Sequence, residues 1–208
     1  MTLKLNGSSS GYTAINAPAS AGSNTLVLPA DNGSANEVLK TDGSGNLDWV
    51  AQGSGLFSAY AFLTHQESEG GNGGSSVQDA WTIRTLNTEI FDSGNIVTLP
   101  GSNVFSITNS GTYFIEWTAP AFESQSHKTR LYDVTGSAVV GYGSSQRIQT
   151  SDNGQSNSSG AARVTIGSTN QYRIEHWAST AKSSTGFGHN VGGSMVETYL
   201  QVKIYKEA

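Results

Sequence analysis

The sequence predicts an all-β protein, and three observations support this class. Glycine makes up 25 of the 208 residues, and serine, threonine and asparagine are also abundant. These residues favour turns or compete with the helical backbone for hydrogen bonds. Apolar and polar residues alternate with period two along most of the chain, whereas no stretch keeps the spacing of an amphipathic helix over three turns.

Residues 1–50 predict short strands separated by turns. Asn-Gly and Asp-Gly pairs between the strands suit hairpin turns that need positive φ. The expected strands are Thr2–Leu5, Tyr12–Asn16, Thr25–Leu28, Glu37–Lys40 and Leu47–Val50. Roughly fifty residues in such short pieces bury too little apolar area to offset their own chain entropy. We therefore expect this β-rich module to fold only against copies of itself or against a partner surface.

A short flexible linker is expected at residues 51–55, and longer strands follow it. The regular spacing of these strands, with Gly, Asn and Ser turns, predicts a sandwich or barrel over residues 56–208. The expected strands are Phe57–Thr64, Ala80–Leu86, Val104–Thr108, Thr112–Phe122, Lys128–Val134, Ala138–Tyr142, Gly160–Ile166, Gln171–Ala178 and Met195–Lys206.

Three long polar loops, 66–79, 143–159 and 179–194, separate these strands. Long loops on a rigid β scaffold commonly carry recognition. The candidate receptor-contacting residues in them are Asn72, Gly73, Ser183, Phe187 and His189.

The strand faces predict a second buried surface besides the core. In the last strand, Val196, Thr198, Leu200, Val202 and Ile204 share the face that fits a core. The other face carries Tyr199 and Tyr205 among polar groups, a mixture that suits a subunit interface. The strand from Thr112 to Phe122 is also apolar on both faces, which indicates a sheet that is covered twice. A broad core with scattered exposed aromatics is the alternative.

From Leu56 onward, several motifs follow one another in an order and spacing that can be compared with known β folds. Phe105 is followed by the stretch Gly111–Trp117, then by Arg130–Asp133, and the closing strand ends at Ile204. In this order and spacing, residues 56–208 resemble the C1q/tumour-necrosis-factor jelly-roll family. The resemblance implies a ten-stranded antiparallel jelly-roll sandwich that forms a homotrimer. It implies no metal, because the calcium ligands of some members are not recognisable.

The same resemblance implies that Tyr113, Trp117 and Tyr199 lie near the threefold axis. The face argument adds Tyr205 to this expected trimer interface.

The stretches Leu3–Tyr12, Ala17–Pro29 and Val38–Val50 are similar to a module of bacteriophage tail-fibre and virion structural proteins. The last of the three is the most distinctive. The resemblance implies a virion-attachment or fibre-shaft element, contact with another virion protein and a threefold assembly. It agrees with the expectation that residues 1–50 do not fold alone.

No catalytic residue, cofactor or metal site is predicted. The histidines lack the i, i+2 or i, i+4 partners of a metal pair, although a zinc site built from different strands or from three copies is an alternative. Glu116 and Glu175 could form the carboxylate pair of a glycosidase, but structural carboxylates are favoured. The stretch from Asp42 to Asp48 lacks the Gly and Glu of a calcium loop and is interpreted as a hairpin turn.

Charge and hydropathy restrict the classes of molecule that the chain is expected to bind. The net charge is −5 and the 11 basic residues are scattered, whereas nucleic-acid binding uses a basic stripe. Apolar runs are far shorter than the ~20 residues that span a bilayer, so no membrane insertion is expected. The chain has no cysteine, which excludes disulfides and a thiol catalyst. The first residues lack the apolar segment of a signal peptide, so synthesis in a host cytoplasm is expected.

These features predict a structural protein of a phage virion, a short trimeric fibre or appendage. Its knob would present three copies of the loops to a cell-surface glycan or protein. The alternatives are a capsid decoration or tail scaffold protein without a receptor role, a surface-polysaccharide depolymerase, and a cellular C1q-like binding module. Copy number separates the first two functions, because a decoration protein occurs in many more copies per particle than a fibre.

Overall fold

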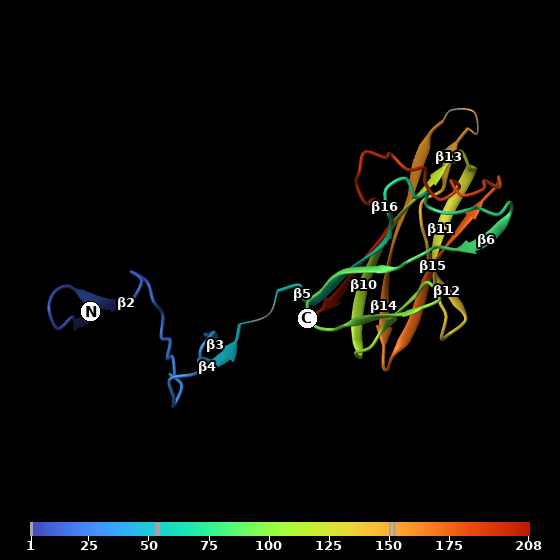
Figure 1. The fold of residues 1–208 in the computed structure, drawn as a ribbon. Coiled ribbons are helices and arrows are strands. Elements are labelled where there is room, and N and C mark those ends of the chain that lie inside the picture. The colour runs from blue at the N-terminus through green and yellow to red at the C-terminus, as the bar shows by residue number, and fades with distance from the viewer. Residues whose placement is uncertain (1, 53–54, 150, 152) are drawn as a thin grey trace. The chain divides into compact units, whose positions relative to one another are not determined.

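The computed structural model describes residues 2–52, 55–149, 151 and 153–208. Within these residues the regular secondary structure consists of β-strands alone (Figure 1). The predicted all-β class is thereby confirmed. The chain divides into two units, residues 1–53 and 54–208. Within the described residues there is no helix long and apolar enough to cross a membrane. Residues 53 and 54 of the predicted linker lie outside the described part of the chain.

The first unit contains two separate hairpins. Strand β1 (Thr2–Asn6) pairs antiparallel with β2 (Tyr12–Asn16), and β3 (Glu37–Thr41) pairs antiparallel with β4 (Leu47–Ala51). The turn between β3 and β4 is held by Asp42, whose Oδ1 accepts hydrogen bonds from the backbone N–H groups of Ser44 and Asn46 at 2.7 and 3.2 Å. The strand expected at 25–28 is reduced to one parallel bridge, Val27 to Asn46.

The second unit contains longer strands, which form two sheets. The first sheet contains β5 (Phe57–Glu67), β7 (Thr88–Asp92), β10 (Gly111–Phe122), β14 (Gln155–Ile166) and β16 (Glu197–Glu207). The second contains β8 (Val97–Gly101), β9 (Val104–Ile107), β11 (Gln125–Asp133), β12 (Ala138–Tyr142), β13 (Gln146–Ile148) and β15 (Asn170–Ala178). Strand β6 (Ala80–Ile83) lies against β15.

The order of the strands identifies this unit as a jelly roll. The first sheet runs β14-β10-β16-β5-β7 and the second runs β12-β11-β15-β9-β8, with β13 attached to β11. From β9 onward the chain crosses repeatedly between the two sheets, and the last strand returns to pair with β5. All pairs within the two sheets are antiparallel, as the sandwich predicted from the sequence requires.

The core lies between the two sheets. It includes Phe105, Ile115, Leu131, Ile174 and Val202, all of which are at most 1% exposed. Each of these residues alternates along its strand with a residue of the outer face, as the period-two pattern predicts.

The outer face of the second sheet is closed by its own side chains. Glu175 lies between two arginines, accepting hydrogen bonds from Arg130 Nε at 2.6 Å and from Arg173 Nε at 2.7 Å. The Arg130 guanidinium stacks on the ring of Trp81 at 4.1 Å, and Arg173 stacks on Tyr132 at 4.8 Å. These three charged groups and the two rings therefore already have partners within the chain.

Candidate functional site

Tyr113 and Trp117 do not lie at a subunit interface, so this part of the prediction is wrong. Their face of β10 is the core face, and both side chains are at most 2% exposed. The Trp117 indole lies across Gly160 of β14, and its Nε1 donates a hydrogen bond to Thr129 Oγ1 at 2.7 Å. Neither ring has free surface to offer to a partner.

Tyr199 is also buried within its own chain, because the ladder between β16 and β5 changes register between Thr198 and Gln201. The irregularity turns Thr198 outward and brings Tyr199 and Leu200 inside together. The Tyr199 hydroxyl donates a hydrogen bond to the Gly71 carbonyl at 2.6 Å. Burial raises the pKa of this phenol to about 12. The expected position of Tyr199 at a threefold axis is therefore corrected, and so is the inward position of Val196, which is exposed.

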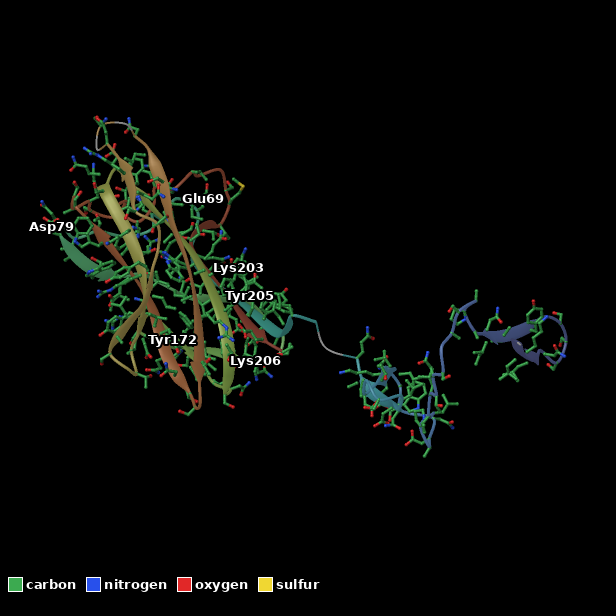
Figure 2. The ribbon with its side chains drawn as sticks, turned by 180° about the vertical axis from the view of Figure 1, so that it is seen from behind. Glu69, Asp79, Tyr172, Lys203, Tyr205 and Lys206 are labelled. Atoms are coloured by element: carbon green, nitrogen blue, oxygen red, sulfur yellow. The ribbon has the colours of Figure 1, made fainter. Side chains whose placement is uncertain are left out.

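Tyr205 lies on the outer face of the first sheet, within a cluster of aromatic rings. Its ring centroid is 4.9 Å from that of Phe57 and 6.2 Å from that of Tyr60, and Tyr60 stacks on Phe91 at 4.7 Å. Tyr60 and Phe91 remain more than 40% exposed. We call Phe57, Tyr60, Phe91 and Tyr205 the aromatic cluster. Figure 2 shows Tyr205 and Lys203 of β16 on the same side of the unit.

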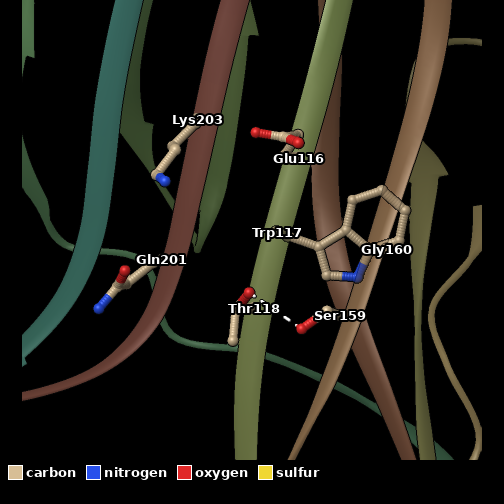
Figure 3. A pocket seen from close by; sticks show the side chains of 7 residues that line it. All are labelled: Glu116, Trp117, Thr118, Ser159, Gly160, Gln201 and Lys203. Carbon is tan, nitrogen blue, oxygen red and sulfur yellow. Dashed lines mark hydrogen bonds between the residues drawn. The ribbon is translucent and has the colours of Figure 1, made fainter.

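A polar groove of about 200 Å³ continues this face away from the aromatic cluster (Figure 3). Glu116 of β10 stands opposite Lys203 of β16 in the ladder. Among the described residues, neither side chain has an ion-pair or hydrogen-bond partner. Thr118 and Ser159 line the groove and share a hydrogen bond of 3.1 Å. This face thus differs from the closed outer face of the second sheet.

The predicted receptor residues divide into buried and accessible ones. Phe187 is 3% exposed and Gly73 is also buried, so both are corrected to packing positions. Ser183 is exposed, but lies apart from the groove described next. Asn72 and His189 come together, because Asn72 Oδ1 accepts hydrogen bonds from the backbone N–H and Nδ2 of Asn190, the neighbour of His189.

A second groove lies where β10 ends and β14 begins. It is lined by Phe122, Asn153, Gln155, His189, Asn190 and Val191 and has a volume of about 360 Å³. Sequence reasoning identified only His189 of these residues. The opposition of Phe122 and Gln155 in the ladder follows from strand register, which the sequence pattern does not determine.

Beneath the loops at this end of the sandwich lies Arg84, a fully buried cation. Its Nη1 donates to the Pro120 carbonyl at 2.9 Å, and its Nη2 donates to the Phe187 carbonyl at 3.1 Å. The guanidinium also stacks on the Phe187 ring at 4.4 Å. Burial lowers the pKa of Arg84 to about 9, which leaves it charged at neutral pH. It has no carboxylate partner among the described residues.

Arg84 begins a directional chain of hydrogen bonds. Its Nη1 faces His176 Nδ1 at 3.3 Å, and because arginine only donates, His176 Nδ1 must accept. His176 Nε2 therefore carries the proton and donates to His127 Nδ1 at 2.9 Å. His127 Nε2 in turn donates to Ser156 Oγ at 2.8 Å. The guanidinium thus fixes both imidazoles as neutral tautomers.

This chain does not activate Ser156 as a nucleophile. A general base would need an acceptor nitrogen facing the serine, whereas His127 presents its N–H. Burial, with a smaller effect of the Arg84 charge, lowers the pKa of His127 to about 4. Burial and then the Arg84 and His127 charges lower the pKa of His176 well below its usual value. The arrangement is suited to holding the loops rather than to proton transfer.

The described residues also contain no group of three acidic, histidine or cysteine side chains that could hold a metal ion. No sequence pattern predicted the hydrogen-bond chain from Arg84 to Ser156. Its members come from different parts of the chain, and only the pairing of β11 with β15 brings the two histidines together.

No family model matches the chain, and no curated protein matches it. Similar solved structures include the globular domain of zebrafish complement C1qA, at 14% identity over 71% of this chain and 95% of that one, with a TM-score of 0.45. Eiger TNF from S. frugiperda is similar at 12% identity over 74% of this chain and 94% of that one, with a TM-score of 0.47. The vertex protein P5 of PRD1 gives 12% identity over 74% of this chain and 100% of that one, also at 0.47. The jelly-roll assignment rests on the strand order of the chain itself.

Proposed function

We propose that this chain is a structural component of a phage virion, a homotrimeric appendage. In this proposal residues 56–208 form a distal knob that contacts the host cell surface. Residues 1–50 form a shaft or attachment module, joined to the knob by residues 51–55. No reaction is assigned to it.

The observation that carries the proposal is the difference between the two outer faces of the jelly roll. On the second sheet, Arg130 and Arg173 pair with Glu175, and the Trp81 ring lies under the Arg130 guanidinium. The first sheet exposes the aromatic cluster beside Glu116 and Lys203, which lack ionic partners among the described residues. Aromatic residues with a polar surround are typical of the core and rim of a protein interface. The first sheet is therefore the surface that a neighbouring copy covers.

The hairpins of the first unit support a multimer independently. In the β1–β2 hairpin, Leu3 and Ile15 stand opposite each other and are 58% and 68% exposed, and Leu5 of the same face is also exposed. An isolated two-stranded hairpin is at best marginally stable in water. Covering this apolar face, by other copies or by another virion protein, is what would stabilise the hairpin. The virion itself is proposed from the resemblance of residues 1–50 to phage fibre modules.

Light scattering on the purified full-length chain tests the assembly. We expect a mass three times the chain mass of 21.8 kDa. Tyr205→Asp should reduce the mass to that of the monomer, because a carboxylate would be desolvated within the aromatic cluster at a cost of several kcal/mol. Tyr142→Asp is the matched control, since Tyr142 is an exposed tyrosine of β12 in the other sheet. A monomeric wild type, or a Tyr205→Asp variant that remains trimeric, would contradict the proposed interface.

The virion part of the proposal is tested by counting copies. Quantitative mass spectrometry of purified particles should find this chain in small multiples of three. Absence from the particles would refute the virion role, and many tens of copies would indicate a decoration protein instead of a fibre.

A further inference from the structure

We infer that the groove between Phe122 and His189 is a binding site for neutral carbohydrate. The inference rests on the proposed function, since it specifies what a virion appendage would contact. The groove has a volume of about 360 Å³, which lies within the range of small-ligand sites. Four of its residues are polar, and three of them, Gln155, His189 and Asn190, are held by hydrogen bonds within the chain.

The apolar wall of the groove is Phe122, the last residue of β10. Its ring lies 5.0 Å from the His189 imidazole with an angle of 48° between the planes, so the two rings form an open corner. Aromatic faces carry a negative quadrupole that attracts the partly positive C–H groups of a sugar ring. Val191, which is 82% exposed, extends this apolar wall.

The free hydrogen-bonding positions follow from those already used within the chain. Gln155 Oε1 accepts the His189 backbone N–H at 3.0 Å, which leaves the Gln155 Nε2 amide as a donor. His189 Nδ1 donates to the Asn190 carbonyl at 2.8 Å, so Nε2 of the neutral ring is an acceptor. Asn190 Nδ2 donates to Asn72 Oδ1 at 2.8 Å, which leaves Asn190 Oδ1 as an acceptor.

These donors and acceptors, together with the side-chain amide of Asn153, stand beside an aromatic wall and match hydroxyl groups, each of which both donates and accepts. None of the six lining residues carries a carboxylate, an ammonium or a guanidinium. A charged sugar would therefore be desolvated there without an opposite charge. The ligand class that fits is a neutral hexose or N-acetylhexosamine.

The groove is also held in place before any ligand arrives. Beyond the bonds of His189 and Asn190, the backbone N–H groups of Val191 and Gly192 donate to Glu197 Oε1 at 3.0 and 2.8 Å. Beneath the loop, Arg84 donates to the Phe187 carbonyl. A preformed loop loses less conformational entropy on binding, which favours a small ligand.

Saturation-transfer difference NMR on the full-length protein tests the inference. The probes are the methyl glycosides of glucose, galactose, mannose, rhamnose, N-acetylglucosamine and N-acetylgalactosamine at millimolar concentration, with methyl glucuronide as the charged comparison. We expect transfer to at least one neutral glycoside and none to the glucuronide. No transfer to any neutral glycoside, or equal transfer to the glucuronide, would overturn the inference.

Gln155→Glu is the decisive variant, because a carboxylate still accepts the His189 N–H but removes the donating amide. We expect it to lower affinity about tenfold. Gln78→Glu is the matched control, since Gln78 is exposed and outside the groove lining. If Gln155→Glu fails to fold, Phe122→Leu removes the aromatic wall and should likewise weaken transfer. Undiminished transfer in the variant that folds would place the sugar elsewhere.

Light scattering on the same samples separates this inference from the proposed function. A trimer that transfers no saturation overturns the carbohydrate site and leaves the appendage intact. A monomer that transfers saturation, sensitive to Gln155→Glu, overturns the trimeric appendage and supports the site.

Discussion

Gly160 is the residue on which the packing of Trp117 depends. A Cβ atom at position 160 would lie 2.2 Å from the indole ring, whereas one at Gly167, just beyond the same strand, would meet nothing within 4 Å. Neither glycine has a positive φ, so backbone strain does not distinguish the two positions. The contrast isolates the effect of overpacking.

Gly160→Ala should therefore lower the free energy of unfolding by about 1–3 kcal/mol. Urea denaturation followed by tryptophan fluorescence measures this change. Gly167→Ala, as the control, should change stability by less than ~0.5 kcal/mol. Equal stability of the two variants would mean that the Trp117 ring can move away from β14.

Arg84 is a buried cation on which several hydrogen-bond acceptors depend. Its charge is neutralised by no carboxylate among the described residues. Arg84→Met would leave the carbonyls of Pro120 and Phe187 and the Nδ1 of His176 without their donors. We expect a loss of about 3–5 kcal/mol in the free energy of unfolding.

The same denaturation experiment tests Arg84→Met. Arg147→Met is the control, because Arg147 is exposed on β13 and should tolerate the change. A stability of Arg84→Met close to wild type would show that the buried charge costs as much as its hydrogen bonds return.

At the scale of elements, the histidine pair couples β11 to β15 and makes this coupling sensitive to acid. The pKa of His127 is about 4 in the folded chain, below the ~6.5 of an unfolded histidine. Between these values the unfolded state binds more protons, so stability is complete above pH ~6.5 and declines as the pH falls toward 4. The difference corresponds to ~3 kcal/mol from His127.

His127→Gln should reduce this acid sensitivity. The glutamine carbonyl can accept from His176 Nε2 and its amide can donate to Ser156 Oγ, yet the side chain does not titrate. Urea midpoints at pH 7 and pH 4.5 should therefore differ less in the variant than in wild type. His189→Gln, at an exposed position, should keep the wild-type difference between the two urea midpoints. An equal difference between the two urea midpoints in all three proteins would contradict a role of His127 in the acid sensitivity.

The elements also show where the sequence was sufficient and where it was not. The alternation in β10 predicted correctly that Tyr113, Ile115 and Trp117 share a face, because period two follows from strand geometry alone. It did not predict which face is the core face of a strand that is apolar on both sides. In β16 the same alternation failed at Tyr199, because an irregular pairing with β5 is a tertiary property that leaves no mark in the pattern.

The candidate site was less predictable than the fold, for a related reason. The loop containing His189 could be recognised by its length and polarity. Its partners Phe122 and Gln155 lie in strands whose register brings them together. Phe187 lies in a glycine-rich loop, as an exposed loop-tip aromatic would. Its ring is nevertheless buried, because it stacks on the Arg84 guanidinium and on the His176 imidazole.

For the whole molecule, the hairpin of β1 and β2 should be ordered only in the assembly. Leu5→Ser together with Ile15→Ser removes apolar groups from one face of this hairpin. Hydrogen exchange followed by mass spectrometry should then find its amides unprotected, while the jelly roll keeps its wild-type protection. Ala14→Ser, on the opposite face, is the control. Unchanged protection in the double variant would mean that the apolar face is not what holds the hairpin.

The internal pairing of Arg130, Glu175 and Arg173 has a consequence for how many copies of the chain can join one assembly. A subunit that binds a neighbouring copy through each of its broad faces forms an open polymer unless the rotation between copies closes a ring. Here one broad face has its charges satisfied within the subunit, so it offers a newcomer little gain in free energy. Whether contacts through the other face close into a ring depends on the rotation that relates neighbouring copies. In the proposed assembly, the paired arginines and glutamate therefore keep this outer face out of the contact between copies.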